Sequence, residues 1–237
     1  KPWLLHGITG SGKTEVYIQI LQSVLSHSNA QVLVLVPEIN LTPQLEARFR
    51  SRLSQYALAT LHSNLSENER LQNWLAASTG AANIVIGTRL SVFTPMPHLK
   101  MIVIDEEHDS SYKQQDGMRY HARDVAMVRA KQLNIPIILG SATPSLESWS
   151  NANIGHQAHA RKSTVNQRLQ ALKSTQKQVY GLLSLTQRAV ENAVLPKIFC
   201  IDTAKSPTEN GLSPLLVKAL RDRLARNEQS LLFINRR

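Results

Sequence analysis

The sequence predicts an α/β fold in which helices cover both faces of a mostly parallel β-sheet. Short apolar, β-branched runs alternate along the chain with segments of helical periodicity, which is typical of βαβ units. Residues 32–36 read VLVLV, and uninterrupted apolar runs of this kind occur in strands that are buried on both faces. A glycine-rich segment separates the first apolar run from the first helical pattern. Together these features indicate a parallel α/β domain.

The individual elements of this domain follow from the same patterns. Strands are expected at 3–6, 32–36, 58–61, 84–86, 101–104 and 137–139. Helices are expected at 13–26, 42–53, 66–78 and 121–132. Ser66 and Glu69 have the spacing of a capping box, with the serine as N-cap and the glutamate at the third helical position. These elements complete a lobe that is expected to span residues 1–150.

The chain changes character after residue 150. Residues 151–184 are interpreted as a basic linker or insert, because no acidic residue lies between Arg161 and Lys177. Helical spacing of three apolar residues allows a short amphipathic helix there. A nucleic-acid-contacting insert is one interpretation, but a solvated or disordered spacer is favoured. Residues 185–237 are expected to supply a strand, a helix around 213–226 and a final strand, which cannot close a sheet of their own.

A phosphate-binding loop is the first functional motif. Residues 7–14 read GITGSGKT and match the pattern GxxxxGKS/T between a strand and a helix. Glycines let backbone N–H groups surround a triphosphate, the lysine reaches its β- and γ-phosphates, and the last hydroxyl binds Mg²⁺. A chance loop match is the alternative. The residues expected to bind the nucleotide are Gly7, Gly10, Ser11, Gly12, Lys13 and Thr14.

An acidic cluster follows the apolar run 101–104 and reads DEEH. Its side chains should project from the carboxyl edge of the sheet, where open α/β folds bind their ligands. Asp105 is expected to hold Mg²⁺ together with Thr14, and Glu106 to polarise the attacking water, with Glu107 as the alternative base. A solvated acidic turn at the start of a helix is the competing interpretation. The two motifs together indicate a nucleoside triphosphatase with Lys13, Asp105 and Glu106 in catalytic roles.

Further motifs follow one another along the chain: VPEINLTPQ at 36–44, LHS at 61–63, ER at 69–70, IVIGTR at 84–89, DEEHDSSYKQQDGMRYHAR at 105–123 and GSATP at 140–144. DEEH and GSATP resemble the motor core of the DEAH-like helicases of superfamily 2. The whole series resembles the bacterial replication-restart DNA helicases, the primosomal N′ family. The resemblance extends over nearly the whole chain, except around 151–180.

This resemblance implies a fold, an activity and partners. It implies a RecA-like P-loop lobe and the incomplete start of a second one, so that the chain would be part of a two-lobed motor. The implied activity is ATP-dependent DNA translocation or unwinding, coupled to single-stranded DNA binding, in replication restart and primosome assembly. The implied cofactors are ATP and Mg²⁺. The implied partners are single-stranded and forked DNA and other primosome proteins, and no membrane.

Residues for DNA binding and for coupling are also implied by the resemblance. Those expected to contact DNA are Thr42, Thr88, Arg89, Tyr112, Lys113, Arg119 and Tyr120. The tyrosines would stack on bases while the basic side chains meet phosphates, although packing roles for both tyrosines remain open. Those expected to couple the nucleotide site to DNA are His108, Ser141 and Thr143. Hydroxyls after a strand are also common helix caps.

Composition agrees with these interpretations. The 237 residues carry a formal net charge of +10, which favours a polyanionic partner. The single cysteine, Cys200, excludes a multi-cysteine zinc site in this part of the protein, whereas the resemblance implies zinc in a part of the family protein without a counterpart here. Cys200 lies in an apolar run and is expected to be buried. No membrane-length apolar stretch and no secretory signal occur, so a cytoplasmic setting is expected, and the resemblance implies a bacterial one.

Three classes of function agree with the motifs. The first is the ATPase lobe of a DNA helicase, with poor hydrolysis when the second lobe is incomplete. The second is a nucleotide-gated nucleic-acid-binding module with little turnover of its own. The third is a P-loop kinase or small-molecule triphosphatase, which would need a substrate lid in place of the helicase motifs. Turnover of ATP with and without single-stranded DNA separates the first two.

Overall fold

The structure is a computed structural model that describes residues 1–37, 43–153, 179–189, 197–202, 204–205, 208 and 211–233. The chain divides into two compact units, Lys1–Glu191 and Asn192–Arg237. The first unit contains the sheet and both nucleotide-binding motifs, and the second contains one helix among its described residues. Thr42 and the basic segment 154–178 lie outside the described residues, so the expectations for them stay untested.

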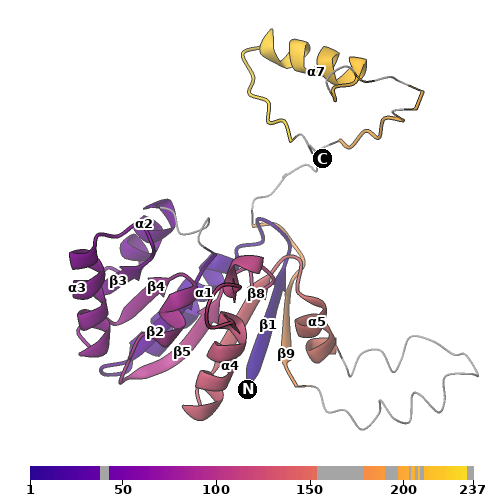
Figure 1. Ribbon diagram of the computed structural model, residues 1–237. Helices are drawn as coiled ribbons and strands as arrows, with labels where there is room; N and C mark the ends of the chain where they lie inside the picture. Colours follow the sequence, from indigo (N-terminus) through magenta and orange to yellow (C-terminus); the bar gives the residue numbers. More distant parts are fainter. Residues whose placement is uncertain are drawn as a thin grey trace, which may run out of the picture. The chain divides into compact units, whose positions relative to one another are not determined.

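A seven-stranded sheet forms the centre of the first unit (Figure 1). In chain order its strands are β1 (Pro2–Gly7), β2 (Gln31–Leu35), β3 (Leu58–Leu61), β4 (Ile84–Gly87), β5 (Leu99–Ile104), β8 (Ile137–Ser141) and β9 (Gly181–Leu185). They lie side by side in the order β3-β4-β2-β5-β8-β1-β9. All six neighbouring pairs are parallel, which brings the carboxyl ends of the strands to one edge.

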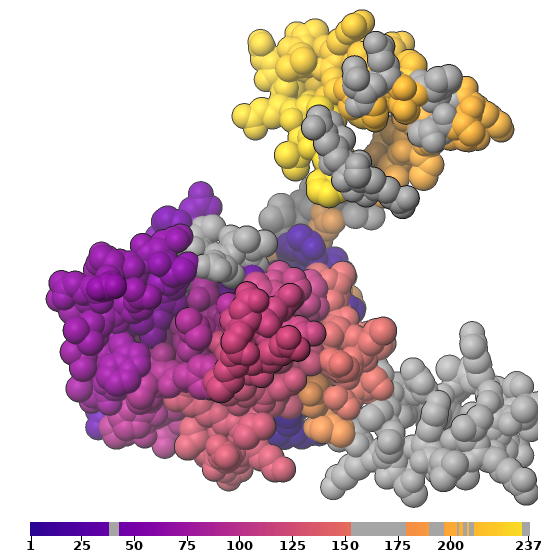
Figure 2. Space-filling model, viewed as in Figure 1, coloured from indigo at the N-terminus to yellow at the C-terminus, as the bar shows by residue number. Residues whose placement is uncertain are grey.

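Two apolar layers hold the helices against the sheet. One layer contains buried residues of α1 (Lys13–Leu25) and α2 (Pro43–Arg52), packed on alternate residues of the central strands. The opposite layer contains buried residues of α3 (Glu67–Ser78), α4 (Ala122–Gln132) and α5 (Leu146–Asn153). Figure 2 shows the region around α4, in pink, over the face of the first unit turned to the viewer. The α/β fold with a mostly parallel sheet is therefore confirmed.

The expected strands and helices of residues 1–141 are present, with ends that differ by at most two residues from the predicted ones. Ser66 forms the capping box at the start of α3, where its side chain accepts from the Glu69 N–H and the Glu69 side chain accepts from the Ser66 N–H. Several short elements were not expected. They are the 3₁₀ helices Arg89–Phe93 (η2) and Ser110–Tyr112 (η3), the antiparallel pair β6 (Lys113–Gln114) and β7 (Tyr120–His121), and α5.

The first unit extends beyond the expected boundary at residue 150. Strand β9 pairs in parallel with β1, and Gly181 lies opposite Trp3. A Cβ at Gly181 would lie 2.1 Å from the Trp3 ring, so glycine is required there. The backbone N–H groups of Val179 and Tyr180 donate to the Asn151 carbonyl at 3.3 and 3.2 Å, which fixes the chain as it returns to the sheet. Residues 181–184, expected in the linker, and residue 185, expected in the second lobe, thus pair with the sheet of the first unit.

The second unit contains α7 (Pro214–Leu224), as expected. Ser213 caps this helix by accepting from the Leu216 N–H, and proline stands in its first turn. The two expected strands are absent from the described residues 197–202 and 231–233. Cys200 is exposed rather than buried. No helix in the described part of the chain is long and apolar enough to cross a bilayer.

Candidate functional site

The glycine-rich loop turns tightly between β1 and α1. Gly10 and Gly12 have φ angles of 78° and 88°, a left-handed conformation that glycine adopts without steric cost. The Ser11 N–H donates to the Ile8 carbonyl at 3.0 Å, and the Gly12 carbonyl starts α1 by accepting from Glu15. The Ser11 hydroxyl is buried without a hydrogen-bond partner among the described residues. The loop therefore fits a phosphate group, which the backbone donors at the start of α1 would bind.

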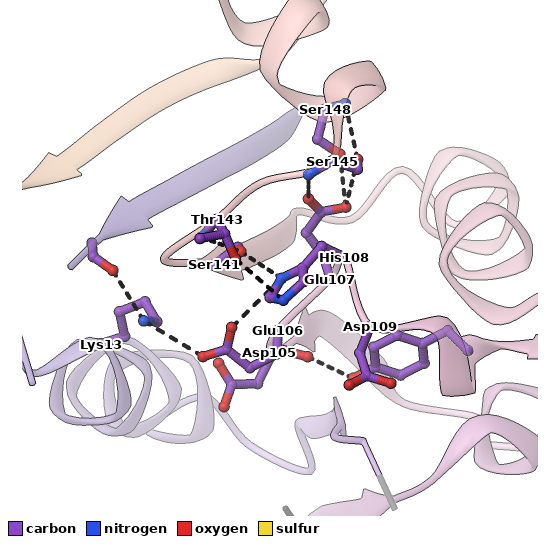
Figure 3. A network of polar contacts seen from close by, with 12 residues as sticks. Lys13, Asp105, Glu106, Glu107, His108, Asp109, Ser141, Thr143, Ser145 and Ser148 are labelled. Atoms are coloured by element: carbon purple, nitrogen blue, oxygen red, sulfur yellow. Dashed lines mark hydrogen bonds and ion pairs between the residues drawn. The ribbon is translucent and has the colours of Figure 1, made fainter. Parts of the chain in front are cut away.

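Lys13 connects this loop to the acidic cluster (Figure 3). Its ammonium group donates to the Gly7 carbonyl at 3.1 Å and lies 3.6 Å from Glu106 Oε1. Only 10% of the Lys13 side chain is exposed. Thr14 follows on the first turn of α1 and is half-buried. The fold thus brings together the phosphate loop and the carboxylates that the sequence predicted to act with it.

Asp105 lies directly after β5, at the carboxyl edge of the sheet. Its Oδ1 atom accepts a hydrogen bond of 3.0 Å from the Tyr17 hydroxyl, and its backbone carbonyl accepts one of 2.6 Å from Tyr112. Burial raises the pKa of Asp105, as does the negative charge of Glu106, while the Tyr17 hydrogen bond and the Lys13 charge oppose this rise. A carboxylate that burial and a like charge destabilise in this way favours a cation as its partner, so the chemistry of the site fits Mg²⁺.

Glu106 adopts a strained backbone conformation, with a φ angle of 45°. Non-glycine residues rarely adopt such angles, and they cluster at functional sites. The turn directs the Glu106 carboxylate between Lys13 and His108. The His108 Nδ1 atom lies 3.6 Å from Glu106 Oε2. The carboxylate stays partly accessible, with 26% of the side chain exposed. This position suits a group that orients a water molecule next to the phosphate loop.

The three residues expected to couple the site to DNA are in contact with one another. His108 Nδ1 lies 2.7 Å from Ser141 Oγ, and His108 Nε2 lies 3.3 Å from Thr143 Oγ1. The Thr143 N–H also donates to Ser141 Oγ at 3.0 Å. Since His108 lies beside Glu106, the segment after β8 is linked to the candidate base through two hydroxyl groups and one imidazole.

Glu107 has a different role from its neighbours, because it is fully buried. Its carboxylate accepts four hydrogen bonds, which come from the Ser145 N–H at 2.7 Å, the Ser145 hydroxyl at 3.1 Å, the Ser148 hydroxyl at 2.9 Å and Arg123 Nη1 at 3.1 Å. A carboxylate engaged in this way cannot polarise water, so the alternative assignment of Glu107 as base is wrong. Glu107 instead ties the DEEH turn to α4 and α5. The spacing of Ser145 and Ser148 marks the start of a helix, but nothing in the linear sequence identifies Glu107 as the partner of these serines.

Thr88 and Arg89 follow β4 and line a surface cavity of about 340 Å³. Its wall also contains His62, Arg70 and Trp74. None of the described residues that line it carries a carboxylate, so the cavity favours an anionic ligand. Arg89 Nη1 is already engaged, since it donates to the backbone carbonyls of Ser111 and Lys113 at 2.9 and 3.3 Å.

The loop after the acidic cluster agrees only in part with the expected DNA contacts. Tyr112 is 0% exposed and its hydroxyl binds the backbone of Asp105. It cannot stack on a base, so the structure corrects its assignment as a DNA-binding residue in favour of packing. Tyr120 is half-buried, with its ring 5.0 Å from that of Phe93. Lys113 and Arg119 are exposed and are free to meet a polyanion.

Comparison with known proteins agrees with this geometry. Residues 1–152 match the DEAD/DEAH box helicase family. The chain is 46% identical over 235 residues to replication restart protein PriA of Haemophilus influenzae. This match covers 99% of this chain and 29% of that protein. It is 41% identical over 241 residues to PriA of Bacillus subtilis, covering 100% of this chain and 27% of that protein.

A third relative, PriA of Synechocystis, is 44% identical over 238 residues. This match covers 99% of this chain and 26% of that protein. The chain therefore spans less than a third of the length of the relatives that it matches. The resemblance to replication-restart helicases that the motifs indicate is confirmed by these matches.

Proposed function

Because the chain belongs to the DEAD/DEAH box helicase family, we propose that it is the ATP-binding lobe of a DNA helicase motor that acts in replication restart. The observation that carries this proposal is the position of Lys13 between the phosphate loop and Glu106, with Asp105 beside them. The names of the relatives that the chain matches support the restart role. Forked and single-stranded DNA and other primosome proteins are the proposed partners, and the bacterial cytoplasm is the proposed setting.

In the proposed mechanism, the chain binds the triphosphate at the start of α1 and activates water next to it. The backbone around Gly10 and Gly12 donates to the phosphates, and Lys13 neutralises their charge. Thr14 and Asp105 would hold Mg²⁺, which when bound withdraws charge from the phosphate oxygens. Glu106 orients the attacking water and accepts its proton, for which its partly exposed carboxylate is suitably placed.

Coupling to DNA is proposed to run through the residues that contact Glu106. His108 bonds to Ser141 and Thr143, so a shift of the segment after β8 would change the position of the imidazole beside Glu106. The cavity next to Thr88 and the exposed Lys113 and Arg119 are the proposed DNA-binding surface. Cations that neutralise phosphates and aromatic rings that stack on bases are typical of single-strand sites.

Nucleotide binding tests the first part of this proposal. A fluorescent ATP analogue is titrated into the wild-type chain and into Lys13→Ala, with Lys100→Ala as a matched control, because Lys100 is an exposed residue of β5. Binding should fall at least about tenfold in Lys13→Ala, since a charge-assisted contact to phosphate contributes about 1.5–3 kcal/mol. Lys100→Ala should bind like the wild type. Equal affinity of the wild type and a folded Lys13→Ala would refute the nucleotide site.

The alternative function is a nucleotide-gated nucleic-acid-binding module with little turnover. It is favoured by one observation: no arginine is among the described partners of Lys13, Asp105 or Glu106. An arginine supplied from elsewhere can contribute about 10³–10⁵ in rate. Turnover of ATP by the chain, with and without single-stranded DNA, separates the two. DNA-stimulated hydrolysis favours the motor, and nucleotide-dependent DNA binding without hydrolysis favours the module.

A further inference from the structure

Tyr17 reaches the acidic cluster from the helix that follows the phosphate loop. It lies in α1, one turn after Lys13, and is 1% exposed. Its hydroxyl donates to Asp105 Oδ1 at 3.0 Å. A single helix thus carries Lys13, Thr14 and a donor to the carboxylate expected to bind the metal. The phosphate-binding and metal-binding halves of the site are joined by a side chain that neither sequence motif includes.

The neighbouring strand leaves room for this contact at one position. A Cβ built on Gly140, in β8, would lie 1.5 Å from the Tyr17 hydroxyl oxygen. The φ angle of Gly140 is not in the left-handed region, so space and not backbone conformation requires glycine there. Any larger residue would displace the hydroxyl from Asp105. The Gly140 carbonyl also accepts from the Glu107 N–H at 3.0 Å, which keeps β8 in register with the DEEH turn.

The hydroxyl acts only as a donor toward Asp105. The Tyr17 hydroxyl points at Asp105 Oδ1 at 3.0 Å, and a carboxylate oxygen can only accept from it. Burying a hydroxyl without a partner is unfavourable, whereas a phenylalanine at this position would bury no polar group. The hydrogen bond to Asp105 is the contact that makes a tyrosine suitable here. A donor on one carboxylate oxygen restricts the rotation of the whole group.

We propose that Tyr17 is a positioning residue that fixes the Asp105 carboxylate for Mg²⁺. Gly140 in β8 permits this role because the absence of a side chain leaves room for the Tyr17 hydroxyl. The inference rests on the proposed function, because it concerns the same nucleotide site. Hydrogen-bond partners of metal ligands orient those ligands, and their loss typically costs about 10–100-fold in metal affinity or activity. Tyr17 takes this role from the phosphate-loop side of the site.

The test measures binding of a fluorescent ATP analogue to the full chain as a function of Mg²⁺ concentration, and again in EDTA. Tyr17→Phe removes only the hydroxyl, and Gly140→Ala displaces it. Both should raise the Mg²⁺ concentration needed for half-maximal binding about tenfold or more. Binding in EDTA should stay at the wild-type level, because the phosphate loop is unchanged.

Tyr112→Phe is the matched control. It removes a second buried hydroxyl, which donates to the backbone carbonyl of Asp105 and not to its carboxylate. It should lower the melting temperature about as much as Tyr17→Phe does, but leave the Mg²⁺ dependence unchanged. An unchanged Mg²⁺ dependence in Tyr17→Phe, or an equal change in Tyr112→Phe, overturns the proposal.

The failure of this inference is distinguishable from a failure of the proposed function. If the wild type binds the analogue and Lys13→Ala does not, the nucleotide site stands. A normal Mg²⁺ response of Tyr17→Phe then refutes only the positioning role. If wild-type binding is independent of both Lys13 and Mg²⁺, the proposed function and the inference fail together.

Discussion

Replacing Glu107 by glutamine should destabilise the first compact unit far more than the same change at Glu106. The Glu107 carboxylate is fully buried and accepts from Ser145, Ser148 and Arg123. Glutamine keeps the size of the side chain but replaces one acceptor oxygen by an NH₂ group. Both oxygens of the Glu107 carboxylate accept from donors, so the NH₂ group of glutamine faces a donor in either orientation of the amide. The negative charge that pairs with Arg123 is also lost.

The size of the effect follows from these contacts. Removing one partner of a buried ion pair costs about 3–5 kcal/mol. The lower end applies here, because Arg123 keeps its hydrogen bond to Glu147 at 2.7 Å and its contact with Asp124 at 3.2 Å. We therefore expect a loss of about 3 kcal/mol in the free energy of unfolding. For a unit of this size that lowers the melting temperature by about 6–12 °C.

Thermal unfolding of three proteins measures this difference: the wild type, Glu107→Gln and Glu106→Gln. The Glu106 side chain is partly exposed and its ion pairs are screened by water, so Glu106→Gln should cost less than about 1 kcal/mol. In the full-length protein, Glu106→Gln should bind ATP but lose turnover. Equal melting temperatures of the two variants would refute the structural role of Glu107. Normal turnover in Glu106→Gln would refute the assignment of the base.

Three further outcomes are expected. Tyr120→Ala should lower the melting temperature of the chain, because its ring packs against Phe93 and such pairs contribute about 0.5–1.5 kcal/mol beyond their buried area; an unchanged melting temperature with loss of DNA-stimulated turnover would favour base stacking instead. Ser66→Ala should cost about 0.5–2 kcal/mol by removing the N-cap of α3, measured by urea unfolding, and Ser66→Thr should restore most of it. The pKa of Glu147 lies below its ordinary value of 4.5 because Arg123 donates to it and attracts its charge. Its stabilising contact is therefore present above pH 4.5 and lost as the pH falls further. Wild type and Glu147→Gln should differ in stability at neutral pH and converge in acid, and a constant difference would argue against this contact.

All strands of the first unit except β9 and the short pair β6 and β7 could be predicted because each contains an apolar run, and β2, β4 and β8 are buried along their whole length. Residues 32–36 are all apolar, so a buried strand is a better prediction for them than a loop. The expected helices have caps or clear periodicity. The phosphate loop and the DEEH turn were predictable for a related reason. In a parallel sheet the carboxyl ends of the strands meet at one edge, so motifs that follow β1 and β5 must lie near each other.

Other features depend on contacts that a linear pattern does not contain. The aromatic and basic residues at 112–120 do not indicate which side chain turns inward, and Tyr112 does so because Asp105 offers it a backbone acceptor. Glu107 looks like its acidic neighbours until Arg123, Ser145 and Ser148 are placed around it. Strand β9, with the sequence GLLSL, lacks β-branched residues and follows a long basic segment. Its partner β1 is more than 170 positions earlier in the chain, so local reasoning did not find it.

The position of β1 has a consequence for synthesis on the ribosome. Within this sheet it is the first strand to be translated, yet its neighbours β8 and β9 are the last two strands of the sheet. At about 5–20 residues per second, both edges of β1 stay open until the later strands emerge, and β9 follows only after roughly 10–40 s. The phosphate loop starts at the end of β1, and the Gly10 carbonyl accepts from the Ala189 N–H at 2.9 Å. The phosphate loop is thus translated before the rest of this sheet but is among its last parts to reach the native form, so nucleotide binding by a nascent chain would report that the sheet is complete.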